Sequence, residues 1–464
     1  MKMALHRCAR WPTPWLLASL GVGFVLAASP AAGQSLDETL AAAYSTNPTL
    51  RAARAQLRAV NEGVPQALSN WRPTVTVTGT AGKQRIESET SVSTSNDTTT
   101  PLTASAVLSQ PLYRGGRTIA ETARAENEVL AQRAALDSVE QSILLRAATA
   151  YMDVWRDQSV LDLNINNERV LQRQLEASQD RFTVGELTRT DVAQSETRLA
   201  VATADRIAAE GNLSTSRAIF QEVVGIAPAV LAAPPPVDNL PSGLDETVQS
   251  AVATNPDVLA ATFAEKAAQK RVREVVGELL PTVSIDASVS HNEETSVSGS
   301  ETDAAQVLAK ITVPLYQQGA VSSRVREAKQ ISSQRRLEID EVRRRQEQEA
   351  VSAWRALETA RAQTRSFEAG VRSAEIALEG VRQENSVGAR TVLDILDAEQ
   401  ELLDAKVNLV RSQRDTVVTG FQVLAAAGRL SARDRGLKVD VYDPEVDYKK
   451  VRSRWFGLDA SETE

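Results

Sequence analysis

Cysteine and histidine are almost missing from this sequence. Its 464 residues contain one Cys and two His, and both Cys8 and His6 lie within the first ten residues. Beyond them only His291 remains. Disulfides, thiolate metal sites, cysteine nucleophiles and Ser-His-Asp relays all need residues that this composition does not supply. We therefore expect no catalytic residues, no metal ligands and no cofactor.

The start of the chain has the three parts of a secretory signal peptide. A basic beginning precedes an apolar stretch over 15–28, and small residues follow up to Gly33. We predict a signal peptide over 1–33, cleaved between Gly33 and Gln34. Cys8 precedes the apolar stretch instead of following it, which argues against a lipid anchor on its thiol.

Long apolar runs and an excess of positive charge are also missing. After the predicted signal, no run approaches the ~18 to 20 apolar residues of a membrane-spanning helix, so a chain that crosses a membrane must use β-strands. The sequence has 52 Lys+Arg against 60 Asp+Glu, and three of the basic residues lie in the signal. Removing it leaves 49 basic against 60 acidic residues, a net charge of −11 that argues against nucleic acid as a partner.

The sequence contains one unit twice. Ser35-Leu-Asp-Glu-Thr-Leu returns as Gly243-Leu-Asp-Glu-Thr-Val, a shift of 208 residues. Val184-Gly185 returns as Val387-Gly388, a shift of 203, and each is followed at the same spacing by Thr, Asp and Glu. A nearly constant offset over so many residues indicates duplication. One repeated unit therefore organises the chain, in place of three unrelated domains.

Proline density marks the junction between the copies. We predict a first repeat over 34–227, a Pro-rich linker over 228–242, a second repeat over 243–430 and a C-terminal extension over 431–464. Each repeat begins with a helical segment that has Asn-Pro near its start and runs to a proline, at 73 or 281. The hairpin, the long helix and the shorter helix that follow are expected at 74–113, 117–184 and 188–225, then at 282–316, 320–386 and 391–428.

The strand predictions depend on the alternation of apolar and polar residues. The helix predictions depend on the absence of proline, which breaks helices. Apolar residues alternate with polar ones from Thr74 to Thr78 and along 283–289, and polar loops are expected at the hairpin tips, 91–100 and 292–302. Proline is missing from 112–227, where apolar residues recur at helical spacing. The helix expected at 117–184 would reach about 100 Å, which predicts an elongated rod.

Four strands with one apolar face can occur in two environments. They can cap a soluble coiled coil, or they can span a bilayer as part of a barrel. In lipid every backbone group must be paired, so an open four-stranded sheet has to close with strands from other copies. Because small barrels begin at about eight strands, at least two copies are then required.

At this point the residues resemble a known family. The Asn-Pro helix starts, the Pro-Leu-Tyr segments at 111 and 314, and above all Val387-Gly-Ala-Arg-Thr-Val-Leu-Asp-Ile-Leu-Asp-Ala-Glu399 resemble the TolC family of outer-membrane channel-tunnel proteins. The resemblance covers about residues 35 to 430. It implies a mainly α fold with a β-barrel: a homotrimer in which each protomer gives four strands to a 12-stranded outer-membrane barrel, continued by a long periplasmic α-helical barrel.

The same resemblance implies a function. It predicts the exit duct of a tripartite efflux or type I secretion system in the outer membrane of a Gram-negative cell, extending into the periplasm. Its partners would be outer-membrane lipid, a periplasmic membrane fusion protein and an inner-membrane ABC or RND-type transporter. Substrate would pass through passively, behind an iris-like gate.

The resemblance also assigns roles at the Val-Gly turns. Asp394 and Asp397 match the family's aspartate ring, and Arg390 matches the arginine that links to a threonine-aspartate pair, here Thr190 and Asp191. Asn385 stands where the family has a gate tyrosine, so we expect the closed state to depend more on Arg390. The turns themselves, at Gly185, Thr188, Gly388 and Thr391, are the expected docking points for the adaptor.

Helix termination alone explains much of this pattern. A left-handed glycine can end each long helix, and Thr188 with Asp191, or Thr391 with Asp394, can form a capping box at the next helix. Capping does not require the two charges that only the second copy has. Arg390 corresponds to Leu187 and Asp397 to Gln194 at the 203-residue shift.

Two other classes of protein share some of these features. A periplasmic adaptor or a structural coiled-coil protein is also exported and helical, but an adaptor is expected to have one helical hairpin and a lipoyl-like domain. An enzyme would need a partnered base, a metal-ligand spacing or a nucleotide loop, which the sequence lacks. The stretch from Val441 to Trp455 departs from the helical pattern and resembles the tail of TolC-like proteins of type I secretion; the alternative is a belt packed outside the helices.

Overall fold

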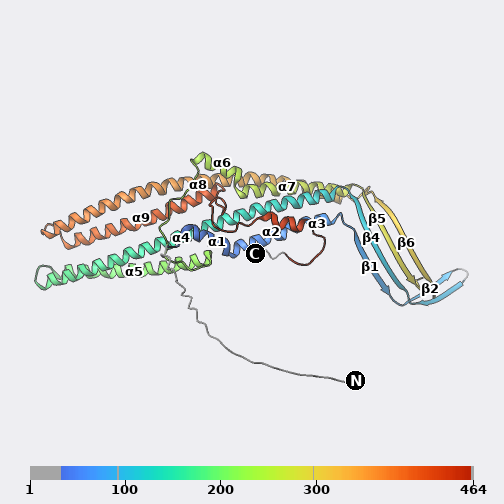
Figure 1. Cartoon of the computed structure of the whole chain (residues 1–464), viewed down its shortest axis with the longest axis horizontal. Coiled ribbons are helices and arrows are strands. Elements are labelled where there is room, and N and C mark those ends of the chain that lie inside the picture. The colour runs from blue at the N-terminus through green and yellow to red at the C-terminus, as the bar shows by residue number, and fades with distance from the viewer. Residues whose placement is uncertain (1–32, 91–92, 296, 461–464) are drawn as a thin grey trace, which may run out of the picture.

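The protein is a long rod with helices at one end and a sheet at the other (Figure 1). A computed structural model describes residues 33–90, 93–295 and 297–460. The predicted signal peptide up to residue 32 lies outside the described residues, whereas Gly33 and Gln34 lie within them. Among the described helices, none combines the length and the hydropathy needed to cross a membrane.

The elements follow the duplicated order. The helices are α1 (Leu36–Thr46), α2 (Pro48–Asn61), α3 (Gly63–Ser69), α4 (Arg117–Thr183), α5 (Arg189–Val224), α6 (Leu244–Thr254), α7 (Pro256–Val276), α8 (Ala320–Ser386), α9 (Val392–Ala426) and α10 (Pro444–Arg452), with a 3₁₀ turn at Gly277–Leu279. The strands are β1 (Thr74–Ala81), β2 (Gln84–Thr90), β3 (Ser93–Thr99), β4 (Leu102–Arg114), β5 (Thr282–Glu293) and β6 (Glu301–Thr312).

The long helices begin and end close to where the sequence predicts them. α4 and α8 have 67 residues each, a length of about 100 Å. Each is followed by a left-handed glycine, Gly185 with φ 82° and Gly388 with φ 80°, which confirms the predicted helix ends. α5 and α9 then run back antiparallel, so each repeat contributes one long helical hairpin.

The first segment of each repeat is more divided than the sequence predicts. Asn47 does cap a helix with Pro48 in its first turn, and its Oδ1 accepts a hydrogen bond from the Thr49 N–H at 2.9 Å. The residues before Asn47 form a separate helix, α1, because the Asn is extended and a proline follows it. α2 itself ends at Asn61, so the expected single helix up to residue 73 is wrong.

The main sheet has the strand order β1-β4-β5-β6, with every neighbouring pair antiparallel. Val77 pairs with Ala106, Ala106 with Val289, and Val289 with Ala305. Directly paired residues lie on the same face, so the alternation places one apolar face across all four strands. β1 and β6 are exposed along their whole length and form the two edges of the sheet.

The hairpin tips differ from the expected loops. In the first repeat β2 and β3 form a further two-stranded hairpin, where we expected an irregular polar segment over 91–100. The Ser- and Thr-rich sequence there is compatible with strand because β-branched Thr favours extended backbone. Residues 91–92 lie outside the described part. In the second repeat β6 ends at Thr312, before Pro314, which has no N–H for a strand ladder.

The main hydrophobic core lies at mid-length, where the short helices pack against α4, α5 and α9. Tyr151, Phe220 and Phe421 are among its fully buried side chains. The Tyr151 hydroxyl lies 2.9 Å from the Gln34 carbonyl oxygen and 2.7 Å from that of Ala232. This phenol therefore joins the beginning of the first repeat to the linker between the repeats.

The C-terminal extension contains a helix that the sequence analysis missed. Asp443 caps α10 and Pro444 occupies its first turn. α10 packs on α2 and α3, and the Asn61 side-chain amide donates to Asp447 Oδ2 at 3.0 Å. The predicted departure from helix is thus wrong for 444–452, where a capping residue and a tertiary contact stabilise a short helix.

Candidate gate and docking turns

Both α-helical hairpins end in turns at the extremity farthest from the sheet (Figure 1). One turn joins α4 to α5 and the other joins α8 to α9. Most of their residues are exposed, including Gly185, Thr190 and Gly388. The turns are therefore accessible to a partner that approaches the end of the rod.

The two turns have the same backbone design. At the first, Gly185 N–H donates to Phe182 O at 3.0 Å and Glu186 N–H donates to Arg181 O at 2.9 Å. At the second, Gly388 and Ala389 make the matching bonds to Asn385 and Glu384, both at 2.9 Å. The left-handed glycine permits these bonds, which satisfy the last carbonyls of each long helix.

Both predicted capping boxes are confirmed. Asp191 Oδ2 accepts from the Thr188 N–H at 2.9 Å and from its hydroxyl at 2.7 Å, and Asp394 does the same with Thr391 at 2.8 and 2.7 Å. These hydrogen bonds stabilise the ionised carboxylate, so they lower the pKa of Asp191 and of Asp394. Both aspartates therefore stabilise the start of the next helix, in addition to any role in gating.

Arg390 is held by carboxylates of its own turn. Its Nε donates to Glu384 Oε2 at 2.9 Å, and its Nη1 lies 3.7 Å from Asp394 Oδ1. Within the described residues of a single copy, Arg390 therefore pairs with these neighbours and not with Thr190 or Asp191. The box uses Oδ2 of Asp191, which leaves Oδ1 outside it. The link between Arg390 and Asp191 stays a prediction about contacts between copies.

Asn385 takes part in the turn as a hydrogen-bond donor. Its side-chain Nδ2 donates to the Arg390 carbonyl oxygen at 2.8 Å, across the loop. This bond fixes the backbone at Arg390, and so the direction in which the guanidinium leaves the turn. The contact of Asn385 is therefore local to the turn.

Asp397 has a partner that the sequence analysis missed. Arg198 Nη2 on α5 lies 2.5 Å from Asp397 Oδ1 on α9, so this ion pair joins the two hairpins. Comparison of the copies shows that both positions differ in charge from their counterparts, because the residue 203 positions after Arg198 is Glu401 and the residue 203 before Asp397 is Gln194. It does not show that the two side chains meet. Asp394 and Asp397 are therefore both compensated within one copy, by Arg390 and Arg198.

Just behind the turns, a small apolar cluster also joins the hairpins. Its buried members come from α4, α5 and α9, and they are Leu171, Ala202, Val392 and Leu396. Because the cluster is small, the free energy that holds the two hairpins together at this end is modest in comparison with the mid-length core. The tips can therefore separate at lower cost than the middle of the rod.

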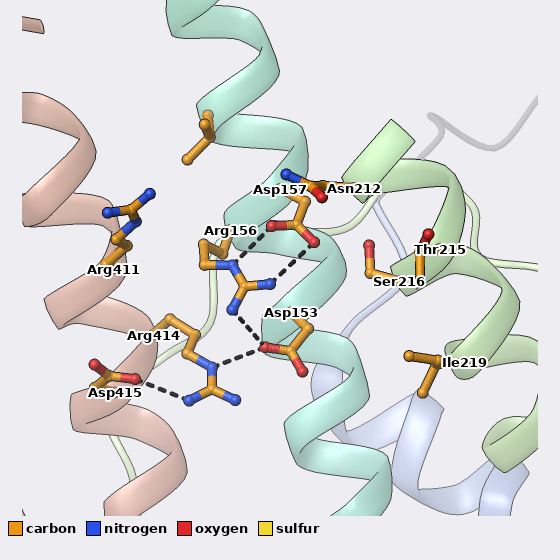
Figure 2. Close-up of a pocket in the computed structure, with 11 residues that line it drawn as sticks. Asp153, Arg156, Asp157, Asn212, Thr215, Ser216, Ile219, Arg411, Arg414 and Asp415 are labelled. Atoms are coloured by element: carbon orange, nitrogen blue, oxygen red, sulfur yellow. Dashed lines mark hydrogen bonds and ion pairs between the residues drawn. The ribbon is translucent and has the colours of Figure 1, made fainter. Parts of the chain in front are cut away.

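A charged groove of about 490 Å³ lies where α4, α5 and α9 meet (Figure 2). Arg414 on α9 lies 2.9 Å from Asp153 on α4, and Arg156 contacts the same carboxylate at 3.0 Å. Arg156 also pairs with Asp157 at 2.7 Å, and Arg414 with Asp415 at 2.8 Å. The network is a second charged link between the hairpins. No sequence motif predicts it.

One group of described residues has a metal-ligand composition. His291, Glu301 and Asp303 place ligand atoms within 4.8 Å of one another near the outer ends of β5 and β6. His291 Nδ1 is 2.7 Å from Asp303 Oδ1, and Nε2 is 3.1 Å from Glu293 Oε1. All of these side chains are partly or largely exposed. Both imidazole nitrogens thus already have hydrogen-bond partners.

Comparison with known proteins agrees with this architecture. The family model described as "Outer membrane efflux protein" matches residues 39–225 and 247–429, which are the two repeats. The chain is 36% identical over 439 residues to the outer membrane efflux protein BepC of Brucella suis, covering 94% of each chain. It is 26% identical to the outer membrane protein TolC of Vibrio cholerae, covering 88% of this chain and 94% of that one.

A solved structure supports the fold independently. The CmeC outer membrane channel of Campylobacter jejuni superposes with a TM-score of 0.77 over 91% of this chain and 90% of that one, at 15% sequence identity. The fold is therefore that of a TolC-like channel, with the duplicated hairpins and the four-stranded sheet in the same arrangement. The chain belongs to the outer membrane efflux protein family.

Proposed function

We propose that three copies of this chain form a closed exit duct in the outer membrane, with the gate at the two helical turns. The observation that carries the proposal is a four-stranded sheet that exposes an apolar face and both of its edges, at the far end of a rod from two matched helical turns. One end is suited to lipid and the other to partners in the periplasm.

The exposed sheet edges argue for several copies. Val77 on β1 and Val307 on β6 are 77% and 72% exposed, although both lie on the apolar face. In a bilayer, unpaired backbone groups at β1 and β6 cost several kcal/mol each, so β1 of one copy pairs with β6 of the next. With the trimer implied by the TolC resemblance, this gives a closed barrel of 12 strands.

The turns are the proposed docking points for a periplasmic membrane fusion protein, which joins the duct to an inner-membrane ABC or RND-type transporter. Gly185 and Gly388 present two nearly identical turns, so one kind of partner hairpin can recognise both. The two equivalent halves also fit a duct better than an adaptor, for which one hairpin is expected. Transport through the duct is passive, and the side chains supply no catalytic step.

Arg390 is the proposed latch of the gate. In a trimer its guanidinium can reach the Asp191 of a neighbouring copy, and three such contacts would close the entrance. Each exposed ion pair is worth only ~0 to 1 kcal/mol, so partner binding can overcome all three.

Conductance in planar bilayers tests the duct and its gate together. The purified protein is expected to migrate as a heat-resistant trimer and to give small, defined channels, and Arg390→Ala is expected to raise the conductance. Arg345→Ala, which removes an arginine paired with Glu341 on the exposed face of α8, is the control and should leave conductance unchanged. Low conductance in Arg390→Ala equal to that of the parent would contradict the latch, and absence of both trimer and channels would contradict the duct.

A further inference from the structure

The segment that follows α10 exposes three large apolar side chains in four residues. Trp455 is 58% exposed, Phe456 85% and Leu458 fully exposed. A soluble surface rarely concentrates apolar groups in this way without a partner. We call residues 455–458 the C-terminal loop.

The C-terminal loop has a defined shape. The Arg454 guanidinium reaches over it and donates to the Phe456 carbonyl at 3.1 Å and to the Asp459 carbonyl at 2.7 Å. Gly457 lies at the tip with φ +117°, and a Cβ there would collide with the Arg454 guanidinium. The backbone is thus folded around one arginine, which leaves the apolar side chains on the outside.

The loop is fixed at the level where the sheet begins. Arg72 Nη1 donates to the Arg454 carbonyl at 2.9 Å, and its guanidinium lies 4.5 Å from the centre of the Trp455 ring. Arg72 is only two residues before β1, and Trp71 beside it is 37% exposed. Other exposed apolar residues occur at the helix-side ends of the strands: Leu112, Tyr113, Leu315 and Tyr316.

Basic residues precede the loop directly. Lys449, Lys450, Arg452 and Arg454 all lie within six residues of sequence. A basic segment followed by Trp, Phe and Leu is typical of chains that lie in a membrane interface, where the cations contact phosphate and the apolar groups enter the acyl region. Trp is enriched at this depth in membrane proteins.

We propose that the C-terminal loop is an interfacial anchor, which inserts Trp455, Phe456 and Leu458 into the periplasmic leaflet of the outer membrane. The proposal rests on the proposed function, because that function places the sheet in the membrane. The apolar face of the sheet and the loop then form one continuous contact with lipid. The occupant is phospholipid, and each protomer contributes one anchor beside the base of its strands.

Fluorescence quenching by brominated lipid tests the anchor in the intact trimer. Trp71, Trp155 and Trp354 are replaced by Phe, which leaves Trp455 as the reporter in the chain beyond residue 33. In vesicles of brominated phosphatidylcholine and phosphatidylglycerol, bromines near the headgroup should quench Trp455 at least about twofold more than bromines at the chain end. A matched variant that keeps only Trp354, which lies half-buried in the middle of α8, should show no quenching.

A second reporter separates failure of the anchor from failure of the duct. Val307→Trp, in a background where all four tryptophans are Phe, places an indole on the apolar face of β6 and should be quenched by deep bromines. If this reporter is quenched and Trp455 is not, the anchor is wrong and the membrane sheet stands. Trp455 emission that is blue-shifted but unquenched means burial against another copy, and also overturns the anchor. If neither reporter is quenched, the proposed function fails.

Discussion

At the scale of single residues, the two helical turns differ in charge although their backbones match. Asp191 and Asp394 cap their helices with the same bonds, a feature that the spacing of Thr and Asp predicts. The ion pair between Arg198 and Asp397 could not be predicted in this way, because it joins helices about 200 residues apart in sequence. Local spacing specifies the caps, whereas only the packing of α5 against α9 brings these two charges together.

Arg198 is expected to restrain cation binding at the entrance. Arg198→Ala leaves Asp397 without its counter-charge, so divalent cations should block the channel at a concentration lower by roughly threefold, the effect of an exposed pair worth about 0.7 kcal/mol. Current block by Mg²⁺ in planar bilayers measures this.

The control for this variant is Arg206→Ala, since Arg206 pairs with Glu168 and Glu210 within the first hairpin and leaves Asp397 untouched. A Mg²⁺ block that is the same in Arg198→Ala and in the parent would show that Asp397 does not face the conducting path.

At the scale of elements, long periodic segments were predicted well and short ones were not. The absence of proline fixes α4 and α8 to within a residue of the expected bounds, although α8 contains Gly370 and Gly380. α1, α3, α10 and each of the strands β2 and β3 are shorter than 12 residues, so one cap or one tertiary contact decides whether they form. The two helical turns were located correctly because glycine and the Thr-Asp pair act within the turn itself.

The elbow between sheet and helices depends on a glycine that touches the other repeat. Gly115, with φ +66°, lies so close to the Gly277 carbonyl that a Cβ would overlap it, whereas Gly116, with φ +73°, has open space around it. Gly115→Ala should therefore combine backbone strain with a clash and cost about 3 kcal/mol or more. Gly116→Ala should cost only the strain, about 1 to 2 kcal/mol.

The temperature at which trimers dissociate on gels compares the two alanine variants. A much lower dissociation temperature for Gly115→Ala than for Gly116→Ala is expected. Equal temperatures would mean that the backbone at Gly277 moves away freely, and that the elbow is not a tight contact between the repeats.

At the scale of the whole molecule, duplication gives two similar hairpins, and a few contacts hold them together. The sequence predicted the two copies and the linker, because repeats are visible without structure. It could not predict that Tyr151 would bind both Gln34 and Ala232, because the linker has no periodicity that places it on α4. The proposed trimer and the proposed membrane contact could not be predicted from sequence periodicity either, because they depend on surfaces that a single chain leaves unpaired.

Tyr151→Phe is expected to loosen this junction. Loss of the hydroxyl removes a buried hydrogen bond worth about 1 kcal/mol, and the linker over 228–242 should become more sensitive to protease. Burial raises the pKa of Tyr151 from 10.0 to about 12. The folded-state pKa is raised, so this stabilisation is complete below pH 10 and is lost as the pH rises through about 12.

Limited proteolysis between pH 8 and 11 measures this effect, with Tyr442→Phe as the matched loss of a half-buried hydroxyl elsewhere. Protection of the linker that is the same in the parent and in Tyr151→Phe would show that the phenol does not hold the junction.

The contact between Arg414 and Asp153 gives α9 a fulcrum against α4. From Arg414 back to the turn at Thr391, α9 extends 23 residues by their numbering, an arm of about 35 Å. A rotation of about 10° at the fulcrum then swings the turn by about 6 Å along an arm of that length. In the proposed duct, the part of α9 beyond Arg414 would therefore act as a stiff arm, so that a slight twist at mid-length becomes a displacement of several ångströms at the turn.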